Sequence, residues 1–255
     1  TEYILSTDAD CLFEPDSVKI LVANMLSDRR IGLVSGAVKK VDKGNRESGE
    51  GIYWKYESFL KLMESKFKTI IGATGVMYLI KRELFTPISS NSPDDFERVL
   101  LIIKNGYYAT YEPRASISLE VTEKATEEVQ RKIRIITQEW FVLKRNKELL
   151  NPFRYPAVSF IFFSHKLLRW LFFVFVLTGF ISNAFLISVG FYRVVFILQI
   201  VVYLLGTLGL ISQAKGKHIP LTGLAGYFVA MVYSSAVAFF HFLQDKKYDL
   251  WNPLR

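Results

Sequence analysis

The second part of this sequence has almost no acidic residues. None occurs between Pro156 and Gln244, and the last 100 residues hold eight Lys and Arg against two Asp. Residues 1–155 are nearly balanced, so most of the net charge of +8 lies in apolar sequence. Such a basic excess is typical of proteins at a bilayer, where Lys and Arg pair with lipid phosphates. The distribution favours membrane lipids as partners, and argues against nucleic acid.

Cysteine is nearly absent as well. The single Cys11 excludes an intrachain disulfide and gives no sign of an oxidising compartment. The chain also starts at Thr1, inside an expected strand and without an initiator methionine. We therefore expect it to be the C-terminal part of a longer protein.

Three long stretches contain no Asp, Glu, Lys or Arg: residues 170–192, 194–214 and 219–244. A helix needs roughly 20 apolar residues to cross the hydrocarbon core of a bilayer. Helices without a polar face are uncommon in soluble proteins. We expect three transmembrane helices over these ranges, within a membrane region of residues 170–255 that ends in a short tail.

Residues 151–169 have their own pattern. His165, Lys166 and Arg169 share one side of an expected helix whose other side is apolar and aromatic, which predicts an interfacial helix in the headgroup plane. Alternatively, the same bases are the flank that stops the first span.

Residues 1–150 alternate between strand and helix patterns. We expect strands at 3–5, 31–38, 76–80 and 107–111, and helices starting near 14–17 and over 53–63, 94–104 and 122–150. This alternation predicts an α/β fold with a largely parallel sheet.

Asp8 and Asp10 follow the first apolar run. Ligands of open α/β sheets collect at strand ends, and two carboxylates one residue apart can share a divalent cation that also binds a diphosphate. The alternative is turn chemistry, because Asp is common where strands end.

Asp94 and Asp95 open the helix over 94–104. With Ser92 as the cap and Pro93 at the first helical position, Asp95 would complete a capping box. The same positive helix end would keep Asp95 ionised, as a general base requires, so the two interpretations are compatible.

Two weaker signals lie between these acids. Gly72-Ala73-Thr74-Gly75 lacks the spacing of a phosphate-binding loop and indicates a tight approach to substrate or backbone. Trp54 and Glu57 could line an acceptor channel, although aromatic residues at helical spacing are more often core.

Taken in order, these motifs resemble the membrane-bound family-2 glycosyltransferases, which include cellulose, chitin, hyaluronan and poly-N-acetylglucosamine synthases. The resemblance rests on residues 7–10, 72–78, 94–96, 111–115 and 164–170. It implies a GT-A domain in residues 1–150, incomplete at its N-terminus, on the cytosolic side of the cell membrane and anchored by several spans.

The resemblance also implies roles for single residues. Asp8 and Asp10 would bind the diphosphate of a nucleotide sugar, such as a UDP-sugar, with its Mg²⁺ or Mn²⁺. Asp95 would be the catalytic base of an inverting transfer, and Asp94, Gly72 and Thr74 would contact substrate.

One family element departs from its pattern here. Processive members carry Gln-Gln/Arg-x-Arg-Trp near the membrane, whereas this chain has Arg131-Lys132-Ile133-Arg134-Ile135, without the Trp. Arg131 and Arg134 could still neutralise the diphosphate, or they form a solvated helix face near anionic lipid. Transfer to a cell-surface polysaccharide or glycan is therefore the leading interpretation. A single addition to a lipid acceptor such as polyprenyl phosphate or ceramide, and a non-catalytic scaffold or channel, are the alternatives.

Overall fold

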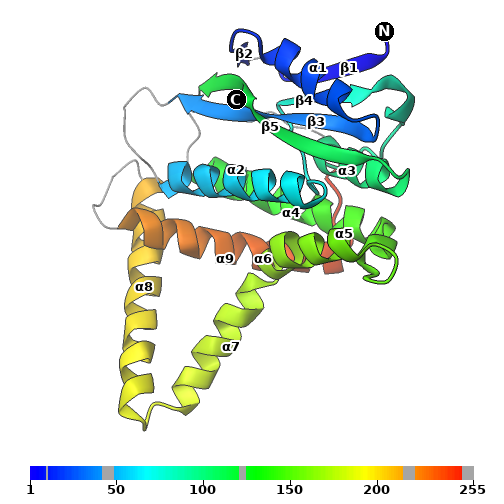
Figure 1. The fold of residues 1–255 in the computed structure, drawn as a ribbon. Coiled ribbons are helices and arrows are strands. Elements are labelled where there is room, and N and C mark those ends of the chain that lie inside the picture. The colour runs from blue at the N-terminus through cyan, green and yellow to red at the C-terminus, as the bar shows by residue number, and fades with distance from the viewer. Residues whose placement is uncertain (10, 42–48, 121–124, 215–221, 249–255) are drawn as a thin grey trace. The chain divides into compact units, whose positions relative to one another are not determined.

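The computed structural model of the chain describes residues 1–9, 11–41, 49–120, 125–214 and 222–248 (Figure 1). The strands are β1 Tyr3–Thr7, β2 Leu12–Phe13, β3 Ile31–Val41, β4 Met77–Lys81 and β5 Tyr108–Glu120. The α-helices are α1 Ser17–Ser27, α2 Gly49–Phe67, α3 Asp94–Lys104, α4 Ala125–Arg145, α5 Pro156–Ile161, α6 Leu168–Trp170, α7 Phe172–Phe185, α8 Gly190–Ala214 and α9 Thr222–Leu243. Short 3₁₀ helices occupy Arg82–Leu84 (η1) and Lys147–Leu150 (η2), and Phe162–Leu167 (η3) is a π-helix.

The chain divides into two compact units. The first comprises residues 1–47, 51–121 and 138–164, and the second residues 48–50, 122–137 and 165–255. The first unit therefore holds the sheet with α1, α3, α5 and most of α2. The second holds the N-terminal part of α4 together with α6 to α9.

The sheet of the first unit is mixed, and the expectation of a largely parallel sheet was wrong. Its order is β1-β4-β3-β5-β2, and among the described strands only β3 and β5 pair in parallel. The reason lies in residues 68–76. The Ile70 amide bonds to Ala109 near the start of β5, and the Thr74 amide bonds to Ser35 farther along β3. The segment advances along β3 and turns at residues 75–76, so β4 runs antiparallel to β3, which alternation of strands and helices could not reveal.

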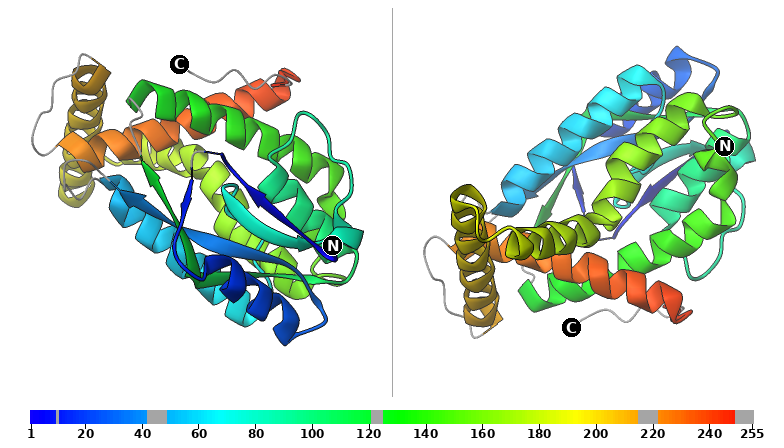
Figure 2. Two further views of the ribbon diagram at one scale, coloured as in Figure 1. Left: turned by 90° about the horizontal axis from the view of Figure 1, so that it is seen from above. Right: turned by 90° about the horizontal axis from the view of Figure 1, so that it is seen from below.

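Helix α1 covers one face of the sheet and α2 lies on the other, with α3 beside it (Figure 1). The core under α1 is made of eight buried side chains: Leu21, Met25, Ile31, Val34, Met77, Leu79, Ala115 and Ile117. Side chains alternate along a strand, so Tyr78 and Ile80 of β4 point to the opposite face from Met77 and Leu79. This alternation turns the Tyr78 hydroxyl toward the side of α2 and α3. Seen from below, α2 and α5 lie in front of the strands (Figure 2).

Helix α3 spans the residues expected for it, but the predicted capping box does not form. Pro93 is the N-cap and makes no side-chain cap bond. The Ser92 hydroxyl instead accepts a hydrogen bond from the Arg145 guanidinium. The helix ends at Asn105 and Gly106, where Gly106 has a φ of +83° that suits glycine.

The apolar helices of the second unit differ in their bounds from the predicted spans. Two helices are long and apolar enough to cross a membrane, at Gly190–Gln213 and Thr222–Leu243. A third candidate exists if Pro156–Trp170 and Phe172–Phe185, which meet at a bend of 58°, count as one broken span.

The single helix predicted over 170–192 is therefore wrong, because a turn at residues 186–189 separates α7 from α8. The Arg193 guanidinium donates to the carbonyl oxygens of Ile187 and Ser188, which the turn leaves outside the helices. Hydropathy could not detect this turn, since every residue in it is apolar or small. Next along the chain, α8 and α9 pack closely, and a Cβ on Gly206 would lie 2.5 Å from the Ala225 carbonyl oxygen.

The basic side expected for residues 151–169 is also only partly exposed. His165 is buried in η3, whereas Lys166 and Arg169 are half-buried. Outward-facing positions are held by Phe160 and Phe163 instead. The π-helical turn adds a residue to the helix, and this shifts the faces from those of a regular α-helix.

Candidate functional site

Asp8 lies beside the residues that lead into β4. Thr7 at the end of β1 pairs with Met77 at the start of β4, and the Asp8 amide donates to the Val76 carbonyl oxygen at 3.4 Å. The Asp8 side chain is exposed there. One of the two acids of the first motif thus stands next to the Gly72–Val76 segment, while Asp10 lies outside the described residues.

The segment of residues 72–75, called the glycine loop below, is fixed from three sides. Lys61 of α2 donates to the Ala73 carbonyl oxygen at 3.1 Å and lies 3.3 Å from the Thr74 hydroxyl. The Ser35 hydroxyl of β3 accepts from the Thr74 amide at 2.7 Å. The Ala73 amide donates to the backbone carbonyl oxygen of Asp95 at 3.1 Å. Because α2, β3 and α3 each hold it, the loop has a defined position on the sheet.

Gly75 brings this loop against the predicted base. A Cβ added to Gly75 would lie 3.3 Å from Oδ2 and 3.5 Å from Cγ of Asp95. Glycine therefore lets the Asp95 carboxylate pack closely against the backbone of the loop. Asp8 is thus bonded to Val76, and Asp95 lies against the adjacent Gly75.

Asp94 has a different partner from Asp95. The Tyr78 hydroxyl donates to Oδ2 of Asp94 at 2.6 Å, a charge-assisted bond between a buried phenol and a carboxylate. Burial raises the pKa of Tyr78 well above its ordinary value, and the bond to Asp94 adds to the effect, while the Ser6 hydroxyl acts against it. Both acids occupy the first turn of α3, where the helix dipole favours negative charge. Tyr78 thus orients Asp94, and Asp95 faces the glycine loop.

The two predicted diphosphate-binding arginines lie in the part of α4 that belongs to the second unit. Burial lowers the pKa of the half-buried Arg134, and the nearby charge of Arg131 acts in the same direction. Between them in sequence, Lys132 forms an ion pair with Glu128, one turn earlier in the helix, and lies over the ring of Tyr227 at 4.2 Å.

Sequence reasoning missed Lys61, Ser35 and Tyr78. The signal for Lys61 was present in Glu57, Lys61 and Glu64, which recur at helical spacing and are all buried. Of the two candidates on this helix, Glu57 is buried, and the side chain of Trp54 lies outside the described residues. The aromatic residues Tyr56 and Phe59 farther along the helix are 55% and 56% exposed. The sequence around Ser35 or Tyr78 contains no motif that predicts their roles, because their hydrogen-bond partners come from distant segments.

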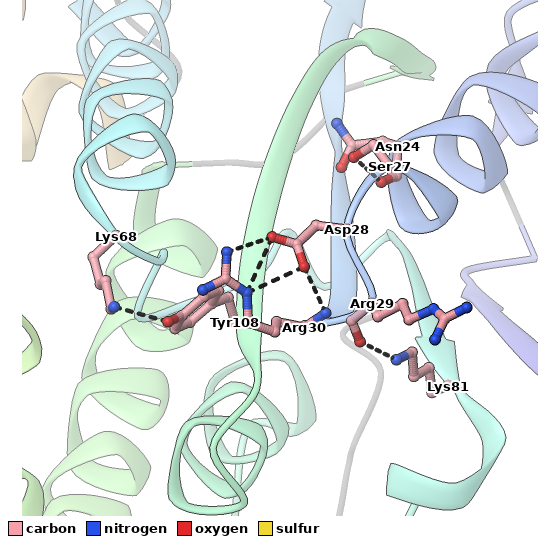
Figure 3. Close-up of polar contacts among 8 residues, drawn as sticks. All are labelled: Asn24, Ser27, Asp28, Arg29, Arg30, Lys68, Lys81 and Tyr108. Carbon is pink, nitrogen blue, oxygen red and sulfur yellow. Dashed lines mark hydrogen bonds and ion pairs between the residues drawn. The ribbon is translucent and has the colours of Figure 1, made fainter.

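A second polar cluster lies at the opposite end of the sheet, where β3 and β5 begin (Figure 3). Asp28 accepts hydrogen bonds from the Arg30 guanidinium, and Lys68 donates to the Tyr108 hydroxyl at 2.8 Å. The Arg30 guanidinium holds the pKa of Asp28 at about 2, and Lys68 lowers the pKa of Tyr108. All four side chains are at the surface, so these bonds compete with water.

The residues present fit a divalent cation only in part. Within the described ranges, no group of three or more His, Cys, Asp or Glu could hold a metal ion. Asp8 offers an exposed carboxylate at a strand end, a hard oxygen ligand of the kind that Mg²⁺ and Mn²⁺ take. A cation would therefore need further ligands, from Asp10 and from a bound phosphate group.

The comparisons with known proteins fit this geometry. No protein-family model and no curated protein matches the chain. Among solved structures, it is similar to the mannosyltransferase PcManGT from Pyrobaculum calidifontis in complex with GDP-Man and Mn²⁺, with a TM-score of 0.54 at 17% identity. The fold is glycosyltransferase-like. The match covers 96% of this chain and 63% of that enzyme, so the chain spans under two thirds of its length.

Proposed function

We propose that the chain belongs to a membrane-anchored inverting glycosyltransferase of the family-2, GT-A type. Residues 1–150 would form the catalytic domain, and residues 170–255 the membrane anchor. The observation that carries the proposal concerns Asp8 and Asp95, which lie 87 positions apart in sequence. The Asp8 amide bonds to the Val76 carbonyl oxygen, and the Asp95 carboxylate lies against the neighbouring Gly75. The glycosyltransferase-like fold supports the reaction class.

Asp95 is the proposed general base. Its carboxylate lies against Gly75, so an acceptor hydroxyl bound beside the glycine loop could transfer its proton to Asp95 as the oxygen attacks the anomeric carbon. Attack from the face opposite the leaving group inverts that carbon, which gives a β-linkage from an α-linked donor. Asp94, held by Tyr78, would bind substrate beside it.

Asp8 and Asp10 are proposed to bind the diphosphate of a nucleotide sugar through Mg²⁺ or Mn²⁺. When bound, such a cation would stabilise the negative charge of the departing diphosphate. Arg131 and Arg134 would add positive charge for the same phosphates. Gly72 and Thr74 of the glycine loop would contact the acceptor sugar.

A growing cell-surface polysaccharide or glycan is the proposed acceptor. A lipid acceptor that receives a single sugar is the second candidate, favoured by the missing Trp after Arg134. The two differ in product size, because repeated transfer gives a ladder or a long polymer and single transfer gives one added sugar.

The test is a screen of the purified full-length protein in lipid against UDP- and GDP-sugars, with Mg²⁺, with Mn²⁺ and with a chelator. We expect one donor to be consumed in a metal-dependent way, with a β-linked product whose length identifies the acceptor class. An α-linked product would contradict the role of Asp95 in an inverting step. No consumption of any donor would support the scaffold interpretation instead.

A further inference from the structure

Helix α2 carries its charged side chains inward and its apolar side chains outward. The buried residues include Glu57, Lys61 and Glu64, each less than one tenth exposed. The outward stripe, called the α2 stripe below, consists of Tyr56 (55% exposed), Phe59 (56%), Met63 (37%) and Phe67 (63%). Successive members are three or four residues apart, so they form one continuous row along the helix.

This orientation is fixed by the glycine loop. Lys61 bonds to Ala73 and Thr74, and on the same side of α2 the Ser65 hydroxyl accepts from the Tyr111 amide of β5. Rotating the helix to bury the stripe would break these bonds and expose the loop. The stripe therefore faces outward because the polar side of α2 bonds to the glycine loop and to β5. A row of large apolar side chains that is exposed to water is typical of a surface that contacts a membrane or a partner.

The stripe continues onto a second element of the same unit. The rings of Phe67 and Phe160 of α5 make an edge contact, with centroids 6.5 Å apart. Phe163, in the π-helical turn that follows, is 52% exposed. Beyond this turn the chain enters α7 and then the long apolar α8 and α9. The apolar surface thus joins the segment that leads into the candidate membrane helices.

The charges beside the stripe are of one sign. Among the described side chains of α2, both acids, Glu57 and Glu64, are buried, whereas Lys55 and Lys66 are exposed. The two lysines are eleven residues apart, about three turns, and so flank the stripe on the same side. Lysines beside an aromatic and aliphatic row are the pattern of a helix lying at a membrane surface.

We propose that the α2 stripe, with Phe160 and Phe163, rests in the headgroup region of an anionic bilayer. Lys55 and Lys66 would pair with lipid phosphates while the four stripe side chains reach the acyl boundary. Lipid fits better than a protein partner because lysine is depleted from protein interfaces, and because the same chain carries helices able to cross a membrane. The helix that holds the glycine loop is then itself held at the lipid surface. This inference concerns position only and does not depend on the proposed sugar transfer.

The test measures depth at single positions, since the candidate spans would retain the protein in lipid whatever α2 does. In a Cys11→Ser background, Phe59→Cys and Met63→Cys are labelled with an environment-sensitive fluorophore in the full-length protein, reconstituted in vesicles of zwitterionic lipid with and without phosphatidylglycerol. Leu26→Cys on α1 is the matched control, because it is an exposed apolar residue, 64% accessible, on the other face of the sheet.

Labels at positions 59 and 63 should emit at shorter wavelength than the label at 26, and lipids spin-labelled in the upper acyl chain should quench them selectively. Water-like emission equal to that at position 26 would overturn the proposal. Short-wavelength emission that no spin-labelled lipid quenches would also overturn the proposal, because the stripe would then be covered by another part of the protein or by a second copy.

A charge variant tests the lipid preference. Lys55→Glu with Lys66→Glu should reduce quenching at position 59 in vesicles that contain phosphatidylglycerol and leave it nearly unchanged in zwitterionic vesicles. Lys19→Glu, an exposed lysine on α1, is the control and should have no effect. Equal quenching in both lipids for the wild type and for the double variant would remove the anionic lipid from the proposal.

Discussion

The two ends of the sheet each place a tyrosine against a charged side chain, and they do so in opposite surroundings. At the end where β4 begins, buried Tyr78 donates to Asp94. At the end where β3 and β5 begin, the half-buried Tyr108 accepts from Lys68 (Figure 3). The pKa of Tyr78 is raised and that of Tyr108 is lowered. The same residue type is thus tuned in opposite directions by burial and by the sign of its partner.

The difference in burial between the two ends determines which hydrogen bonds hold their partners in place. Around the glycine loop, the bonds of Ser35, Lys61 and Tyr78 are formed by side chains that are almost wholly buried, so losing one leaves a partner without water to replace it. At the far end, water can replace every lost bond. Substitutions should therefore have large effects at the first end and small effects at the second.

Asp95→Asn should give the largest effect. If Asp95 accepts the acceptor proton, the amide cannot do so, and turnover should fall by about 10²- to 10⁴-fold. Donor binding and thermal stability should change little, because the amide keeps the size of the side chain. The measurement is single-turnover sugar transfer beside a thermal melt. Wild-type turnover in a folded Asp95→Asn variant would exclude Asp95 as the base.

Lys61→Met and Lys68→Met compare two lysines that are seven residues apart. Lys61 bonds to the glycine loop, and Lys68 bonds to Tyr108 at the opposite end of the sheet. Lys61→Met removes the donor to the Ala73 carbonyl and to Thr74, which should cost about 1–3 kcal/mol of unfolding free energy and slow transfer as the loop loosens. Lys68→Met should do neither, since Lys68 is exposed. Denaturant unfolding and transfer rates measure both. Equal destabilisation by the two variants would show that the buried lysine contributes no more to stability than the exposed one. Rescue by Lys61→Arg would identify the positive charge as the required feature.

Gly75→Ala tests the space beside the base. The new Cβ would lie 3.3 Å from the Asp95 carboxylate, so that group must shift by a few tenths of an ångström. A displacement of this size should lower turnover by about tenfold. Gly179→Ala in α7 is the control, because no atom lies within 4 Å of its added Cβ. If Gly75→Ala behaves like the control, the carboxylate does not border the reacting group.

The start of α3 shows which features could be predicted from the sequence. Asp94 and Asp95 were placed correctly at the start of α3, because acids after Ser-Pro have a strong local signal. The hydrogen-bond partners of that helix start were not, since Ser92 is taken by Arg145 and Asp94 by Tyr78, both remote in sequence. Local chemistry predicts where a helix begins, and the tertiary fold decides which partners its side chains take.

The same division holds for α2. Its helical period was visible, but a pattern with apolar residues on one side and charges on the other predicts that the apolar side is buried. Here the buried side is the charged one, because the segment of residues 68–76 offers Lys61 its partners. The antiparallel β4 has the same origin. The path of an irregular segment such as residues 68–76 is what the sequence could not reveal.

The two tyrosines should also titrate in opposite directions from the ordinary pKa of tyrosine. A raised folded-state pKa means that folding is hindered once the unfolded tyrosine ionises, so Tyr78 should cost stability as pH rises above about 10. Tyr108, with its lowered pKa, should contribute stability that grows as pH rises through its folded value. Phenolate absorbance of Tyr78→Phe and Tyr108→Phe, each subtracted from the wild type, isolates the two groups. Tyr78 ionising before Tyr108 would reverse the assignment.

Asp28→Asn should give the smallest effect. Its bonds to Arg30 lower the pKa of the carboxyl to about 2, so at neutral pH the pair is fully ionised. Nevertheless, both groups lie in water, where the attraction is offset by hydration and by the entropy of two mobile side chains. We expect an unchanged melting temperature and unchanged transfer, and the same result in high salt. A large loss of stability would mean that the hydrogen bonds around Asp28 contribute as much to stability as those around the glycine loop. Burial alone would then not explain which bonds stabilise the fold.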